Sequence, residues 1–75
     1  MARPQADRII DARDMEPPEP FVQTMDALDP KLTLLLILTR EPYPLYRALQ
    51  KQGYDYQVDI TMHGTVEILI WRNQS

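Results

Sequence analysis

The clearest pattern in the sequence is an alternation of apolar and polar residues in the C-terminal third of the chain. Residues 54–62 read YDYQVDITM and residues 66–71 read VEILIW, and every second residue in both stretches is apolar. A period of two places successive side chains on opposite faces of a strand. His63 and Gly64 lie between the two stretches, and a glycine at such a position is typical of a tight turn. The pattern therefore predicts a β-hairpin.

Two stretches nearer the N-terminus also predict strands. Residues 32–39, LTLLLILT, are apolar on both alternating faces, which is typical of a central strand that is covered on each side. A buried helix would look similar over so few residues, but Pro30 and Pro42 leave room for only one or two helical turns. Residues 8–12, RIIDA, predict a short strand because turn-forming residues follow them.

The stretch after the first prolines has the period of a helix. Phe21, Met25 and Leu28 lie at positions i, i+4 and i+7, with Val22 beside them, so we expect this stripe to face the core. Pro30 ends the pattern, because a proline disfavours helical dihedral angles in the residue before it. The polar residues of the other face are expected to point to solvent, namely Gln23, Thr24 and Asp26.

A second helix is predicted within residues 41–53, EPYPLYRALQKQG. Pro42 and Pro44 suit a first helical turn, where backbone N–H groups have no partner within the helix. Gly53 suits the position just after the end, where a left-handed residue closes a helix. The residues expected to face the core are Leu45, Ala48 and Leu49.

The order of these elements, β-α-β-α-β-β, predicts an α+β fold. We expect a two-layer α/β sandwich in which two helices cover one face of a four-stranded mixed sheet. Residues 1–7 show no periodicity and are expected to form a flexible N-terminal tail, and residues 8–75 are expected to form a single domain. In the last strand, alternate residues should face the helices, namely Val66, Ile68 and Ile70. Leu69 and Trp71 should then point to the opposite face.

Composition excludes several classes of function. The 75 residues carry a net charge of −3 with no basic run, which argues against a nucleic-acid partner. Residues 32–39 are the longest apolar stretch and are far too short to span a bilayer, and the N-terminus lacks the apolar segment of a signal peptide. We therefore expect a cytoplasmic protein without a membrane partner. The chain has no cysteine, which excludes disulfides, thiolate metal sites and thiol chemistry.

Residues 11–20, DARDMEPPEP, resemble the start of the TusA-like (SirA-like) sulfur-carrier proteins. In that family the first strand runs into a D-x-R-G-φ-x-C-P-x-P pattern, with φ apolar, that opens the first helix. The positions that agree with it here are Asp11, Arg13, Met15, Pro18, Glu19 and Pro20. The order of elements is also that of the family, so the resemblance extends from about Arg8 to Arg72. It looks closest to a cysteine-free, uncharacterised bacterial branch of that superfamily.

Two positions depart from the family pattern. Asp14 stands where the pattern has glycine, and Pro17 stands where it has cysteine. In the carriers that cysteine lies near a helix N-terminus, which stabilises a thiolate and then a persulfide. Proline offers no nucleophile, and the thioether of a methionine cannot carry a terminal sulfane sulfur. The resemblance therefore implies the family's scaffold without its sulfur-carrier activity.

Other candidate sites are weaker. The prolines at positions 17, 18 and 20 are interpreted as the rigid start of a helix, with a polyproline ligand or an anion site helped by Arg13 as alternatives. His63 is the only histidine and is interpreted as a turn residue. Asp14 and Glu16 are interpreted as solvated loop charges, because acid–base catalysis needs a cleft. We expect no catalytic residue, cofactor or metal, and hence no enzyme.

A candidate interaction face remains. Leu69 and Trp71 would lie on the face of the sheet that two helices on one side leave open, and an exposed apolar patch with a tryptophan is typical of a partner surface. We therefore predict a protein partner or self-association, and a non-catalytic protein-interaction or ligand-binding module. The resemblance also implies an alternative, an accessory protein of sulfur transfer or of redox or nitrogen-oxide metabolism.

Overall fold

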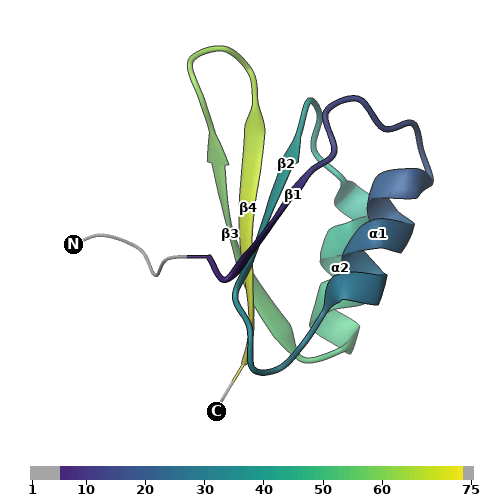
Figure 1. Ribbon diagram of the computed structural model, residues 1–75, viewed down its shortest axis with the longest axis vertical. Helices are drawn as coiled ribbons and strands as arrows, with labels where there is room; N and C mark the ends of the chain where they lie inside the picture. The colour runs from purple at the N-terminus through teal and green to yellow at the C-terminus, as the bar shows by residue number, and fades with distance from the viewer. Residues whose placement is uncertain (1–5, 74–75) are drawn as a thin grey trace.

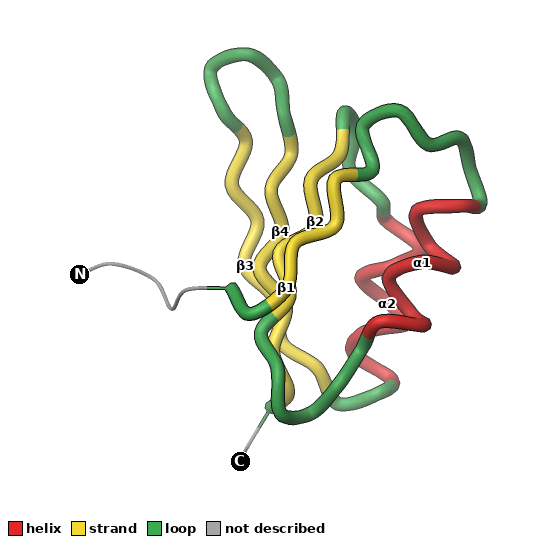
Figure 2. Tube along the Cα trace, viewed as in Figure 1, coloured by secondary structure: helices red, strands yellow, loops and turns green. Residues whose placement is uncertain are grey.

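The computed structural model describes residues 6–73, in which two helices pack on one face of a four-stranded sheet (Figure 1). The trace coloured by secondary structure shows the same two layers (Figure 2). This arrangement confirms the predicted α+β sandwich. The elements, in chain order, are β1 (Arg8–Asp11), α1 (Glu19–Ala27), β2 (Leu34–Leu38), α2 (Tyr43–Lys51), β3 (Tyr54–Ile60) and β4 (Val66–Arg72).

The sheet is mixed, with the strand order β1-β2-β4-β3. β1 runs parallel to β2, whereas β4 is antiparallel to both β2 and β3. Since β1 and β2 are parallel, their carboxyl ends lie at the same edge of the sheet, and each strand is followed by a loop and then a helix. The loops that follow β1 and β2 are therefore brought together at one end of the molecule, where both helices begin (Figure 1).

The core lies between the sheet and the helices. Leu34, Leu36 and Leu38 of β2 are paired in register with Ile70, Ile68 and Val66 of β4, and all of these side chains are buried. Leu45 and Leu49 of α2 are buried against them. The predicted inward residues of the last strand are therefore confirmed, and so are the two leucines of the second helix.

The predicted inward face of α1 is partly wrong. Met25 and Leu28 pack on the core as expected, but Phe21 is 38% exposed and Thr24, expected in solvent, is completely buried. The core that α1 covers consists mostly of leucine and isoleucine side chains, and α1 presents to it the small residues Thr24 and Ala27 together with Met25. The stripe is rotated around the helix, which leaves Phe21 at its edge.

Both glycines adopt the conformations that the sequence predicts. Gly53, which follows the C-cap residue Gln52 of α2, has a φ of +82°. Gly64, in the turn between β3 and β4, has a φ of +83°. L-residues rarely adopt such angles, so both positions favour glycine.

The start of the described chain differs from the expected tail of residues 1–7. The backbone N–H of Asp7 donates to the Thr33 carbonyl oxygen at 2.7 Å, and the Asp7 carboxylate accepts from the Thr33 N–H at 2.8 Å. Asp7 therefore belongs to the folded domain, because these bonds tie it to the residue that precedes β2. The rest of the predicted tail, up to residue 5, and the last two residues of the predicted domain lie outside the described residues.

Candidate functional site

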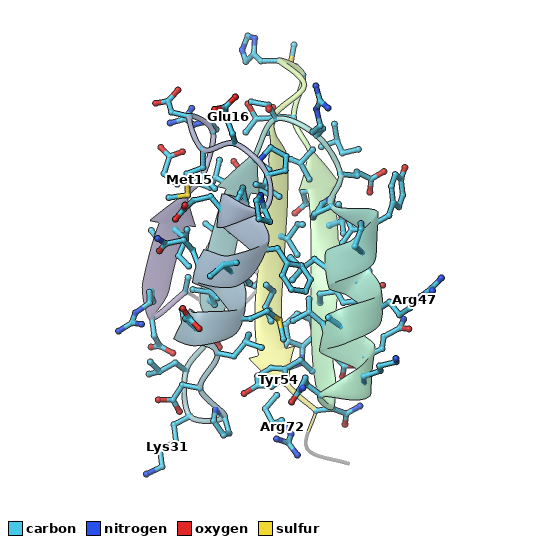
Figure 3. The ribbon with its side chains drawn as sticks, turned by 90° about the vertical axis from the view of Figure 1, so that its right-hand side faces the viewer. Met15, Glu16, Lys31, Arg47, Tyr54 and Arg72 are labelled. Atoms are coloured by element: carbon cyan, nitrogen blue, oxygen red, sulfur yellow. The ribbon has the colours of Figure 1, made fainter. Side chains whose placement is uncertain are left out.

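A pocket of about 600 Å³ lies where the two helices begin and the two parallel strands end. One wall comes from the loop after β1 and the first turn of α1, and the other from the loop after β2 and the first turn of α2. Figure 3 shows Met15 and Glu16, two of its residues, beside the start of α1. Its apolar lining consists of Ala12, Met15, Pro17, Pro18, Pro20, Phe21, Leu38, Pro42, Pro44 and Leu45, and its polar lining of Glu16, Thr39, Arg40 and Glu41.

Prolines of both helix starts make up much of the pocket wall. Pro20 and Pro44 lie in the first turns of α1 and α2 and have no N–H group. The N–H of Glu19 is already used, since it donates to the Glu16 carbonyl oxygen at 2.9 Å. Few backbone donors are therefore left for an anion, although helix N-termini usually supply them. The pocket is suited to apolar contact more than to phosphate binding.

The Glu41 carboxylate is held in place by two phenols that lie outside the pocket lining. The hydroxyl of Tyr43 donates to one of its oxygens and the hydroxyl of Tyr46 to the other, each at 2.9 Å. The ring of Tyr46 stacks on Tyr56 with the ring centroids 4.7 Å apart. Burial and the hydrogen bond to Glu41 raise the pKa of Tyr46, and the hydrogen bond to Glu41 raises the pKa of Tyr43. Both phenols therefore stay protonated and keep donating across the physiological pH range.

Arg40 lines the pocket next to Glu41 in the chain and is exposed. Among residues 6–73, no hydrogen bond or ion pair joins its guanidinium to another side chain. Because the two tyrosines occupy the Glu41 carboxylate, the neighbouring opposite charges do not neutralise each other. The lining thus contains an arginine that is available to a ligand.

The predicted family-motif positions divide into two groups. Pro17, Pro18 and Pro20 line the pocket. Asp11 and Arg13 do not. The Arg13 guanidinium donates to both Asp11 oxygens, at 2.9 and 2.6 Å, and this hydrogen bonding lowers the pKa of Asp11 to about 2.

The other motif residue outside the pocket lining is Glu19, whose carboxylate accepts a hydrogen bond from the Gln23 amide at 3.0 Å. The Asp11 carboxylate and the Arg13 guanidinium likewise bond to each other. An anion site that uses Arg13 is therefore not formed here, and the motif contributes to the pocket through its prolines.

The remaining candidates from the sequence, His63, Asp14 and Glu16, do not form a common site. His63 lies exposed in the β3–β4 turn, and no group of histidine and acidic side chains within the described part of the chain could hold a metal ion. Glu16 lines the pocket, whereas Asp14 does not. In residues 6–73 there is also no helix that is long and apolar enough to cross a membrane.

The predicted interaction face, Leu69 and Trp71, is only partly accessible to a partner. Leu69 lies on the face of the sheet without helices but is only 2% exposed, so it is not accessible to a partner, and Trp71 is half-buried. Leu35 lies directly opposite Leu69, and Ile9 directly opposite Leu35, so these side chains share this face. Ile9 is 62% exposed and is the accessible apolar residue that the sequence analysis did not single out.

The sequence contained one unused signal for the pocket. Pro18-x-Pro20 and Pro42-x-Pro44 repeat the same spacing at the start of each helix, and each motif follows a strand. Two parallel strand–helix units with the same proline spacing place two proline-lined helix starts side by side. The pocket is completed by residues next to these motifs. Phe21 follows the first motif, and Arg40 and Glu41 come just before the second.

Comparison with known proteins agrees with this fold. A crystal structure of a SirA-like protein from Desulfitobacterium hafniense superimposes with a TM-score of 0.76 and 19% sequence identity, covering 89% of this chain and 99% of the other. The resemblance to SirA-like proteins is thus confirmed in the fold. A search of curated proteins finds no significant match. A family model described as "Uncharacterized conserved protein (DUF2249)" matches residues 9–72, and the chain therefore belongs to that family.

Proposed function

We propose that this domain is a non-catalytic ligand-binding module that uses the pocket between its two helix starts. The observation that carries the proposal is the pocket itself, which has about 600 Å³ of volume and a lining of mostly apolar side chains with four polar ones. Small-molecule sites typically have roughly 300–1,000 Å³ and the same mixture of apolar walls and a few polar groups. Its volume and its chemistry both support binding of a small molecule.

The residue at the family's cysteine position supports a role without sulfur transfer. Pro17 lines the pocket where the motif of the carriers has its cysteine, and the chain contains no cysteine elsewhere. A ring that carries no nucleophile contributes apolar surface only. The Glu41 carboxylate accepts hydrogen bonds from Tyr43 and Tyr46, so it is already engaged in contacts within the fold.

The proposal predicts that Phe21→Ala weakens binding of an apolar probe. Phe21 is the only aromatic side chain in the described lining, and it is exposed enough to be replaced without opening the core. With the neutral fluorescent probe N-phenyl-1-naphthylamine, we expect saturable binding to the native chain and a loss of about five- to tenfold in affinity for the variant, because part of an aromatic contact is removed.

The matched control for this experiment is Val22→Ala. Val22 follows Phe21 on the same helix, is 47% exposed and does not line the pocket, so its replacement should leave the affinity unchanged. Absence of saturable binding by the native chain, or an equal loss in both variants, would remove the pocket as the functional site.

We also propose a protein contact through the helix-free face of the sheet. Ile9 is 62% exposed there, and in-register pairing places it on the same face as Leu35 and Leu69. The expected partner is a different protein whose own apolar surface covers Ile9.

Sedimentation of the purified chain tests this assignment. We expect a monomer even at high concentration, because one exposed isoleucine offers too little apolar area for a stable pair of identical faces. The control is Ile9→Asp, which should sediment as the native chain does. A native dimer that this substitution dissociates would assign the face to self-association and contradict the proposed partner.

A further inference from the structure

We propose that the ligand of the pocket is a small molecule with an aromatic ring system. This inference rests on the proposed function, because it names the class of ligand for the same pocket. It follows from the kinds of apolar residue in the lining. Five of the ten apolar residues are prolines, and the others include one phenylalanine and one methionine. Each of these residue types makes contacts with an aromatic ring that a saturated ring does not offer.

The open-chain aliphatic residues of the lining contribute little accessible surface. Ala12, Leu38 and Leu45 are buried and belong to the core that the helices and the sheet share. The prolines of the lining, together with Met15 and Phe21, are exposed or half-buried. A ligand in the pocket therefore meets mainly proline rings, one aromatic ring and one thioether.

Phe21 and Met15 favour an aromatic ligand directly. Phe21 lines the pocket from the first turn of α1, and a pair of aromatic rings is more stable than its buried area alone accounts for. Met15 lines it from the loop after β1, beside the start of α1 (Figure 3). The sulfur of a methionine makes favourable contacts with aromatic rings, often at the ring edge. A saturated ligand would gain neither of these contributions.

The prolines favour a ligand that is flat and rigid. Proline rings pack against aromatic faces when proline-rich segments bind to aromatic-lined grooves, and here the prolines belong to the protein. They come from both walls, Pro17, Pro18 and Pro20 from one and Pro42 and Pro44 from the other. A proline loses no side-chain entropy when a ligand covers it, and a flat ring system also loses little. A flexible acyl chain would lose its rotational freedom on binding.

The hydrophobic effect alone predicts the opposite preference. A saturated ring carries more hydrogen atoms than an aromatic ring with the same number of carbons, and it therefore exposes at least as much apolar surface to water. Burial in proportion to area would make the saturated ligand bind equally well or more tightly. A preference for the aromatic ligand thus reports the specific contacts of the lining.

The test compares 2-naphthylmethanol with decahydro-2-naphthylmethanol on the full chain by NMR chemical-shift titration. Both alcohols are neutral and have the same carbon skeleton. We expect the aromatic alcohol to bind about five- to tenfold more tightly, because contacts with Phe21 and Met15 add to the buried area. Phe21→Leu keeps an apolar side chain without an aromatic face, and it should reduce this preference about threefold. Met15→Leu removes only the sulfur contact and should reduce the preference about twofold.

The matched control is Met62→Leu, the same exchange in the loop between β3 and β4. Met62 is 98% exposed and does not line the pocket, so both affinities should stay unchanged. Equal binding of the two alcohols, tighter binding of the saturated one, or no binding of 2-naphthylmethanol would overturn the aromatic assignment. Saturable binding of the naphthylamine probe would then leave the proposed function standing. If neither the alcohols nor the probe binds, the proposed function fails as well.

Discussion

Replacing Leu36 with alanine is expected to lower the free energy of unfolding by about 3 kcal/mol. Leu36 lies in the middle of β2, is completely buried, and is paired in register with Ile10 on one side and Ile68 on the other. Its removal leaves a cavity that neighbours on two strands cannot fill, and buried Leu→Ala substitutions cost about 2–5 kcal/mol. A domain of this size has about 5–10 kcal/mol of stability in total, so the variant should be close to unfolding at 37 °C.

Urea denaturation followed by the fluorescence of the single tryptophan, Trp71, measures this loss. The control is Ile60→Ala on the edge strand β3, where the side chain is 61% exposed. There the loss should stay below about 1 kcal/mol, because little apolar surface becomes exposed. Equal losses in the two variants would contradict the position of the core between the helices and the sheet.

This core was predictable because the spacing of apolar residues along a strand or a helix indicates which of its side chains are buried. The alternation in residues 66–71 assigned Val66, Ile68 and Ile70 to the helical side, and all of them are buried there. The apolar run of residues 32–39 indicated a central strand, and β2 lies between β1 and β4. Such patterns depend only on the local repeat of a chain and on the existence of one apolar layer.

The orientation of α1 was predicted less well, because a short helix has few residues to define its stripe. Phe21, Met25 and Leu28 form a regular repeat, but Thr24 has the small volume that the crowded sheet surface accepts. The residues against which a helix packs are distant in sequence, so the local repeat alone does not define its rotation. Hydrophobicity alone assigns a threonine to solvent.

The pocket was not predicted, for a different reason. Its two walls come from residues 12–21 and 38–45, and the hollow between them exists only because β1 and β2 are parallel neighbours. The motif directed attention to Pro17, Pro18 and Pro20 as a helix start, which is where they lie. Arg40 and Glu41 were not predicted as site residues, since nothing local in the sequence indicates that they share a pocket with Phe21.

The prolines link the fold to the proposed function. In a carrier, the N-terminus of the first helix stabilises a thiolate through free N–H groups. The carriers' pattern also has prolines at the positions of Pro18 and Pro20, so the difference within the pocket lining at this end of α1 is Pro17. The same end of the same scaffold thus presents an apolar ring to the pocket where the motif of the carriers has a thiol.

Replacing Thr24 with valine is expected to raise the free energy of unfolding by about 1–2 kcal/mol. The Thr24 side chain is completely buried, and its hydroxyl has no hydrogen-bond partner. An unpaired buried hydroxyl costs about 1–3 kcal/mol, and valine keeps nearly the same shape without a polar atom. Both residues are β-branched and similar in helix propensity, so the backbone of α1 should not change. Urea denaturation of both proteins measures the gain.

The control that separates shape from polarity is Thr24→Ser. Serine keeps the hydroxyl and loses the methyl group, so this variant should lose about 1 kcal/mol through a small cavity while the unpaired oxygen stays. A valine variant less stable than the native chain would show that the hydroxyl is bonded in solution. The carbonyl of Pro20, four residues earlier, would be its natural acceptor, because threonine hydroxyls in helices often bond there. Thr24 would then hold the first turn of α1, and with it Phe21 and Pro20 in the pocket wall.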